Sequence, residues 1–218
     1  MARRRGERVR RCAAAVALVA AAVVLPAGCR FGDALSVDEV REIADAVDPE
    51  GGIECPLPYD FAAAAGAAGV AGDAGPGYAT ADLPALSGAS DGGSDPDGPL
   101  ARNPGGVVSC VFHIGGEDLE VHTVATRRPQ ALSVLFPVAA KAAGPGPEGL
   151  VPFGAQAAAA KAGVPVLTAS GNVAAVRLEL DGDGDASLLL TAGDAGHSGL
   201  SRGQVEGLAQ ALASQVQG

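Results

Sequence analysis

Four β-rich segments, arranged as two pairs around glycine-containing turns, constrain the fold of this chain more than any other feature. The first pair, residues 107–114 and 119–126, flanks a Gly-Gly-Glu-Asp turn, and the second pair, residues 173–180 and 186–191, flanks a Gly-Asp-Gly turn. Because short β-rich runs on either side of such turns are typical of hairpins, the sequence predicts two antiparallel hairpins. We expect residues 164–168 to pair beside them as a further strand.

Helical signals lie before, between and after these strands. Residues 36–47 and 201–216 each begin with the spacing of a capping box, a serine followed three residues later by Glu or Gln, and continue with apolar residues at helical spacing. Residues 58–65 and 129–143 are also predicted to be helical, and Pro137 is expected to kink or divide the latter. The sequence therefore predicts one α+β domain, in which helices pack on one side of an antiparallel sheet of about four or five strands.

The N-terminus has the layout of a signal peptide. Six arginines lie within the first 11 residues, and residues 12–27 form an uncharged, mainly apolar run. This run of 16 residues is shorter than the roughly 20 that a permanent membrane-spanning helix needs, so a retained anchor helix is the weaker alternative.

The apolar run closes on the sequence LPAGC at residues 25–29, which resembles the lipobox of bacterial lipoproteins. The resemblance implies that residues 1–28 are removed, that Cys29 carries a lipid, and that the protein is held at the outer face of the cell membrane. Lipoboxes usually have a branched aliphatic residue three places before the cysteine, where this chain has Pro26. The alternative is ordinary secretion after cleavage near Ala27.

The number of cysteines supports lipidation. Without the leader, which contains Cys12, the chain keeps Cys29, Cys55 and Cys110, an odd number in a compartment where thiols tend to pair. If Cys29 carries a lipid, Cys55 and Cys110 are left to form one disulfide that staples the domain. On the loop-entropy model, a bridge across a loop of this length contributes about 4 kcal/mol to stability. The alternative is two unpaired buried thiols.

The charge of the chain disfavours nucleic acid as a partner. The whole chain has a net charge of −10, and residues 1–28 hold six arginines and one glutamate, so the part from Cys29 onward is at −15. Its nine basic residues are spread singly apart from Arg127 and Arg128. Such a surface lacks the cluster of basic residues that binds a phosphate backbone, and it should be repelled by anionic lipids. The acyl chains would then hold the protein at the membrane without a contribution from a cluster of basic residues.

The mature chain is expected to form a tether and one domain. Residues 29–35 would serve as anchor and tether, and residues 36–218 as a single extracytoplasmic domain. Within that domain, residues 66–106 consist largely of Gly, Ala, Asp, Ser and Pro. Because this composition offers too little apolar surface to offset the entropy of ordering, we expect most of the segment, about residues 66–106, to be a mobile loop.

His113, Glu120 and His122 are the candidates for a metal site. With an even-numbered turn in the first hairpin, all three project from the sheet face opposite Cys110, and two imidazoles with a carboxylate could hold zinc or copper. The alternative, which we favour, is that they are ordinary polar residues of a solvated sheet face, with no metal or other cofactor. Helices over that face would strengthen the metal interpretation.

The order of these features along the chain resembles a known family. A helix, a Cys-Pro entry at Cys55, a long loop, a strand with Cys110, a hairpin and a terminal helix follow one another over about residues 36–217. This layout resembles small actinobacterial lipoproteins of unknown function whose domains are similar to the Mog1/PsbP-like α/β/α sandwich. The resemblance implies a structural Cys55–Cys110 pair and a lipid on Cys29, and it implies no catalytic residue.

Three classes of function remain open. The first, which we favour, is a surface-exposed lipoprotein that binds an unknown protein or small molecule and is not an enzyme; a deep apolar pocket between sheet and helices would favour the small molecule. The second is a structural or assembly accessory of a cell-envelope complex, which would expose an apolar patch. The third is a metal-dependent or hydrolytic enzyme, which would need a nucleophile and its base in one cleft.

Overall fold

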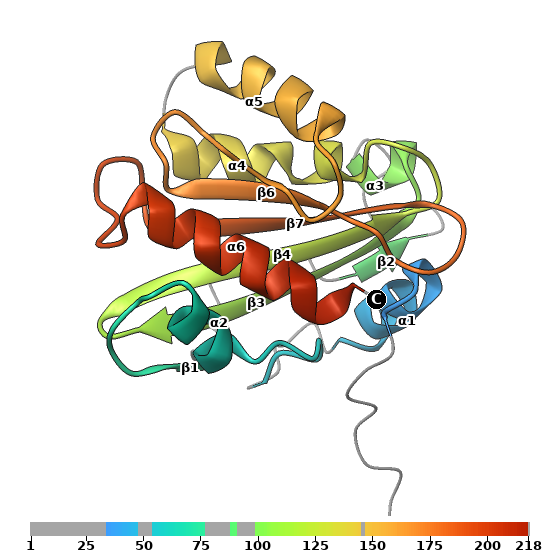
Figure 1. The fold of residues 1–218 in the computed structure, drawn as a ribbon. Coiled ribbons are helices and arrows are strands. Elements are labelled where there is room, and N and C mark those ends of the chain that lie inside the picture. The colour runs from blue at the N-terminus through green and yellow to red at the C-terminus, as the bar shows by residue number, and fades with distance from the viewer. Residues whose placement is uncertain (1–33, 48–53, 77–87, 91–98, 145–146, 218) are drawn as a thin grey trace, which may run out of the picture. The chain divides into compact units, whose positions relative to one another are not determined.

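A single antiparallel sheet forms the middle of the domain. The computed structural model describes residues 34–47, 54–76, 88–90, 99–144 and 147–217. Within these residues seven strands pair in the order β1-β3-β4-β7-β6-β5, and β2 pairs with β3 as well (Figure 1). The predicted α+β class with an antiparallel sheet is confirmed, and the sheet has more strands than the four or five expected.

The first predicted hairpin is the long centre of this sheet. A two-residue turn joins β3 (Gly105–Ile114) to β4 (Glu117–Thr126). Gly115 at the first turn position has a φ of 62°, a left-handed conformation that a type II′ hairpin turn requires there and that glycine adopts without steric cost. In the resulting register Cys110 lies opposite Val121, so the apolar residues expected to share one face do share it.

The second predicted hairpin completes the sheet. It consists of β6 (Val173–Leu178) and β7 (Asp185–Ala192), and β5 (Pro165–Leu167) pairs along the outer side of β6 as expected. β7 also pairs with β4 over eight residue pairs, from Leu119 opposite Ala192 to Thr126 opposite Asp185. This pairing joins the two hairpins into one continuous sheet.

The expectation of a loop over residues 66–106 needs correction in part. β1 (Ala74–Pro76) and β2 (Gly88–Ser90) pair with opposite ends of β3, and α3 (Pro99–Arg102) precedes it. Strand pairing at a sheet edge uses backbone hydrogen bonds, so small residues can pair although their side chains bury little. Residues 77–87 and 91–98 of the same segment lie outside the described residues.

The two predicted capping boxes begin the first and last helices. α1 (Val37–Ala46) and α6 (Arg202–Val216) each start after a serine whose hydroxyl accepts a hydrogen bond from the backbone N–H three residues later. α2 (Phe61–Ala67) begins later than Pro58, because the side chain of Asp60 accepts a hydrogen bond from the N–H of Ala63 and caps the helix there.

Three further helical elements follow the central hairpin. η1 (Ala131–Leu135), a 3-10 turn, leads into α4 (Phe136–Ala143), so the helix expected over this region is divided next to Pro137 as predicted. α5 (Pro147–Ala159) was not expected. It contains Pro152 together with two glycines, which lower helix propensity and obscure the helical pattern in the sequence.

Helices cover both faces of the sheet, so the expectation of helices on one side is wrong. α1, α2 and α6 share an apolar core with one set of strand residues, and η1, α4 and α5 share a second core with the other set (Figure 1). The physical reason is that residues of both alternating sets on the central strands are apolar, for example Val108 in the first core and Val107 in the second.

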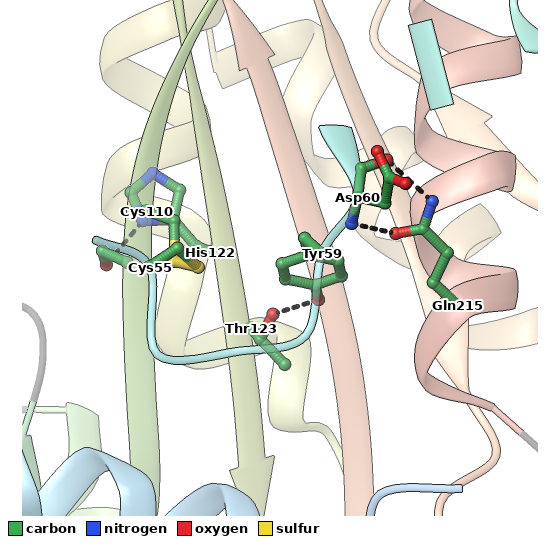
Figure 2. Close-up of a disulfide and its surroundings, with 8 residues drawn as sticks. Cys55, Tyr59, Asp60, Cys110, His122, Thr123 and Gln215 are labelled. Atoms are coloured by element: carbon green, nitrogen blue, oxygen red, sulfur yellow. Dashed lines mark hydrogen bonds between the residues drawn. A yellow bond between two sulfur atoms is a disulfide. The ribbon is translucent and has the colours of Figure 1, made fainter. Parts of the chain in front are cut away.

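The predicted disulfide is formed between Cys55 and Cys110. Their Cα atoms are 5.2 Å apart, and the bridge ties the segment before α2 to the middle of β3 (Figure 2). Beside it the rings of Phe61 and Phe112 stack with centroids 4.4 Å apart. A disulfide of this kind indicates an oxidising, extracytoplasmic compartment.

The predicted leader and the lipid site at Cys29 lie outside the described residues, so both remain predictions. In the part of the chain that the structure describes, no helix combines the length and the apolar character that crossing a bilayer requires.

Replacing both bridge cysteines, Cys55→Ala with Cys110→Ala, should lower the free energy of unfolding by up to about 4 kcal/mol, because the unfolded chain regains the freedom of a long loop. Urea denaturation followed by circular dichroism measures the loss. Cys12→Ala, in the predicted leader, is the matched control and should change nothing. A double variant as stable as this control would contradict the stapling role.

Candidate functional site

A buried histidine lies on the sheet face that η1 and α4 cover. His122 of β4 has 0% of its surface exposed. Its Nδ1 is 2.8 Å from Oγ of Ser109 on the neighbouring β3, and its Nε2 is 3.2 Å from Oε2 of Glu120. Because an ionised carboxylate can only accept, Nε2 carries a proton and donates a hydrogen bond to Glu120. The ring is therefore held at both nitrogens.

The structure brings together two of the three residues considered for a metal. Glu120 and His122 are in contact, but His113 lies opposite Asp118 while His122 lies opposite Ser109. The two histidines are thus separated by about 13 Å along the hairpin, at roughly 3.3 Å per residue. Although helices do cover this face, the described part of the chain contains no group of three or more His, Cys, Asp or Glu side chains placed to hold a metal ion.

Ser109, His122 and Glu120 follow one another in the order of a nucleophile, a base and a carboxylate. The hydrogen bond from His122 lowers the pKa of Glu120, burial opposes this, and the positive charge of nearby Lys141 lowers the pKa further. Glu120 is therefore ionised at neutral pH, and its charge holds the imidazole in one tautomer.

A cavity of about 240 Å³ opens beside Glu120, between the sheet and α4. Its polar lining comes from Asp118, Glu120, Lys141, Thr191 and Asp194. Ser109 and His122 do not contribute to this lining, so a molecule in the cavity would meet the carboxylate and not the serine. The geometry therefore makes the buried histidine, bonded to the half-buried serine, a support for Glu120.

A larger cavity of about 490 Å³ lies between the sheet and the helices η1, α4 and α5, and we refer to it as the α5 cavity. Its floor consists of side chains from β6 and β7, and its walls come from small and apolar residues of the helices and the turn before them. The lining residues are Pro129, Gln130, Leu132, Ser133, Phe136, Gly154, Ala155, Ala157, Ala158, Arg177, Asp185 and Ser187.

The polar floor of the α5 cavity is built around Arg177. Its Nη1 donates to the carbonyl of Ala160 at 3.2 Å, which fastens the C-terminal end of α5 to the sheet. Its Nη2 is 3.8 Å from Oδ1 of Asp185, an ion pair too long for a hydrogen bond. The other oxygen of Asp185 accepts from the N–H of Ala131 at 2.8 Å. Arg177 is thus held in place while 39% of its side chain stays exposed.

Ser187 lies directly opposite Arg177 in the β6–β7 pair. Only 1% of its surface is exposed, and it lines the α5 cavity. Among the described residues its hydroxyl has no hydrogen-bond partner. The cavity therefore contains a donor ready for a ligand.

The helix side of the α5 cavity depends on close packing between α4 and α5. A Cβ atom at Gly154 would collide with the ring of Phe136, so glycine is needed for the ring to lie against α5. Gln130, at the cavity's edge, has a φ of 75°, a left-handed conformation that only glycine among the other described residues adopts. Such strained positions are often found at binding sites.

Sequence reasoning missed this cavity for two reasons. α5, which forms one wall, was not predicted, and Arg177 was regarded only as part of a strand. A signal was nevertheless present, because Arg177 is the only charged residue in the otherwise apolar strand Val173–Leu178. A charge inside an otherwise apolar strand indicates a polar group inside the protein.

A third cavity, of about 290 Å³, adjoins the α5 cavity at the end of the β6–β7 hairpin. Arg177 and Asp185 line both, so this ion pair separates the two spaces. The remaining lining includes Val37 of α1 and Glu179.

The lowered pKa of Glu120 predicts a dependence of stability on pH. The folded protein binds the proton of Glu120 more weakly than the unfolded chain, so its contribution is complete above the ordinary value of 4.5 and is lost as the pH falls through the folded pKa. Glu120→Gln should therefore be less stable than the wild type at pH 5, and the difference should shrink as the pH falls below 4.5.

Urea unfolding of both proteins between pH 3 and pH 5 tests this expectation. Ser109→Ala is the matched control, because it removes the other hydrogen bond to His122 without removing a titrating group in that range. Its stability difference from the wild type should stay constant. A constant difference for Glu120→Gln as well would contradict the assigned role of the carboxylate.

No protein-family model, no curated protein and no solved structure matches this chain. The resemblance to small lipoproteins with a Mog1/PsbP-like domain therefore stays a prediction, and the function is inferred from the cavities and the side chains that line them.

Proposed function

We propose that this protein is an exported, lipid-anchored binding protein for a small molecule, with its binding site in the α5 cavity. The observation that carries the proposal is the place and lining of this cavity, between the sheet and the helices. Its volume of about 490 Å³ lies within the range of roughly 300–1,000 Å³ that is usual for small-molecule sites.

The chemistry of the lining supports the same conclusion. Small-molecule sites are mostly apolar and contain a few polar groups that orient the ligand. In the α5 cavity the helix side offers Leu132, Phe136 and three alanines beside the polar Gln130 and Ser133. The sheet side offers Arg177, Asp185 and Ser187. An apolar ligand body would therefore lie against the helices while its polar end faces the strands.

The anchoring part of the proposal is supported by the sequence at residues 25–29 and by the disulfide. The lipobox-like sequence would place a lipid on Cys29, and the bridge between Cys55 and Cys110 suits an oxidising compartment. The binding domain would then work at the outer face of the cell membrane and need no catalytic group.

An assembly accessory of a cell-envelope complex is the second candidate. Phe136, Val151 and Val164 are the large apolar residues that are exposed among those described, with exposed fractions of 39%, 74% and 48%. All three lie on or next to α4, α5 and β5. A protein partner that covers this side would bury them.

Native mass spectrometry of the full chain, extracted from its own host membranes, tests the proposal. We expect a mass equal to residues 29–218 plus acyl chains, with an additional small-molecule mass that is present in the native spectrum and lost on denaturation. Ala158→Trp should remove the additional mass, because the indole would fill the α5 cavity.

Ala159→Trp is the matched control, because it places the same ring on the next residue of α5, which does not line the cavity. It should keep the additional mass. No additional mass in the wild type, or equal retention by Ala158→Trp, would contradict the binding site. An unlipidated chain that begins at another residue, or one that keeps residues 1–28, would contradict the anchor.

A further inference from the structure

We propose that the ligand of the α5 cavity is an amphipathic carboxylate, whose carboxylate binds Arg177 and Ser187 and whose apolar part lies against Leu132, Phe136 and the alanines of α5. This inference rests on the proposed function and adds the chemical class of the ligand. It is carried by two polar groups that the fold leaves open to the cavity.

The first group is the guanidinium of Arg177. A guanidinium has five N–H donors in a planar fork that matches the two oxygens of a carboxylate. In the described part of the chain one hydrogen bond is made, to the carbonyl of Ala160, and the approach of Asp185 at 3.8 Å is an ion pair without a hydrogen bond. Donors of Arg177 therefore remain for a ligand in the cavity that it lines.

The second group is the hydroxyl of Ser187. Register places Ser187 opposite Arg177, and the alternation of β7 turns its side chain to the same face as Leu189, which packs in the core under α5. The residue is buried and lines the α5 cavity. It adds a second donor beside the guanidinium, so one carboxylate can be bound by both strands.

Asp185 does not prevent binding of an anion at this place. One of its oxygens accepts from the N–H of Ala131, and its charge faces the guanidinium. One guanidinium can bind two carboxylates at the same time through different N–H donors. Asp185 instead orients Arg177, since the ion pair and the bond to Ala160 hold the guanidinium between the floor of the cavity and the end of α5.

The rest of the cavity is suited to an apolar chain. Leu132, Phe136, Ala155, Ala157 and Ala158 contribute carbon surface, and none of them has a side-chain donor or acceptor. Burying a charged head group without partners would be costly, and here the charge meets Arg177 at one end while the chain is removed from water at the other. A neutral ligand of the same shape would lose the charged hydrogen bonds.

The test uses two photoreactive probes with the full chain held in phosphatidylcholine nanodiscs. One probe is decanoic acid with a diazirine near the far end of its chain, and the other is decan-1-ol with the same diazirine. After illumination, peptide mass spectrometry measures labelling of Phe136 and α5. We expect the acid to label these residues about tenfold more than the alcohol, as charged hydrogen bonds of ordinary strength imply.

Variants separate the head-group contacts from the cavity itself. Arg177→Met should lower labelling by the acid to the level of the alcohol, and Arg177→Lys should keep part of the preference, because it retains the charge without the fork. Ser187→Ala should reduce labelling by the acid several-fold and removes no hydrogen bond between described residues. Thr191→Val is the matched control for Ser187→Ala. Thr191 also carries a buried hydroxyl on the same face of β7, but it lines the 240 Å³ cavity and not the α5 cavity.

The outcomes distinguish this inference from the proposed function. Equal labelling of Phe136 and α5 by both probes, unchanged in Arg177→Met and Ser187→Ala, would overturn the carboxylate class and leave a binding cavity. If neither probe labels the cavity above the surrounding surface, this inference is overturned, and the native spectra of the wild type and Ala158→Trp then decide the proposed function by themselves. If Arg177→Met does not fold, labelling of Ser187→Ala and Arg177→Lys tests the carboxylate class instead. Ser187→Ala leaves the hydrogen bond from Arg177 to the end of α5 intact.

Discussion

The burial of both faces of the β3–β4 hairpin is the constraint on which the rest of the structure depends. A strand with apolar side chains on both faces would expose them to water on any uncovered face, so helices must cover both faces. One core contains Val108, Cys110 and Val121 together with α1, α2 and α6, and the other contains Val107 and Val124 together with η1, α4 and α5. The second hairpin extends the same two faces through β7, which pairs directly with β4.

The two sides of the sheet are closed in different ways. On one side the disulfide and two hydrogen bonds between Asp60 and Gln215 of α6 fasten α2 to its neighbours (Figure 2). The stacked rings of Phe61 and Phe112 add to this contact. On the other side α5 packs on the sheet through Phe153 and several small residues, and its C-terminal end is held by Arg177. Alanine and glycine fill less space than larger side chains, which is why the largest cavity described lies under α5.

Polar side chains inside the second core divide into satisfied and open groups. His122 bonds to Ser109 and Glu120, so its two ring nitrogens are used within the protein. Arg177 and Ser187 keep donors for a molecule in the α5 cavity. This difference is the reason to regard the histidine as support for the fold and the arginine as the recognition group, since a ligand can only bind polar groups that the protein has not already paired.

The sequence by itself determined the elements that depend on nearby residues or on the number of cysteines. The capping serines, the Gly115 turn, the division near Pro137 and the pairing of Cys55 with Cys110 all follow from residues within a few positions or from the number of cysteines. Only the tertiary structure decided that β4 pairs with β7, that helices cover both faces, and that α5 forms over Arg177. Those features depend on contacts between distant segments, and α5 in particular has weak helix propensity because of its proline and glycines. The same reason explains the candidate site, because Arg177 and Ser187 become neighbours through strand register, and the cavity above them exists only when α4 and α5 pack together.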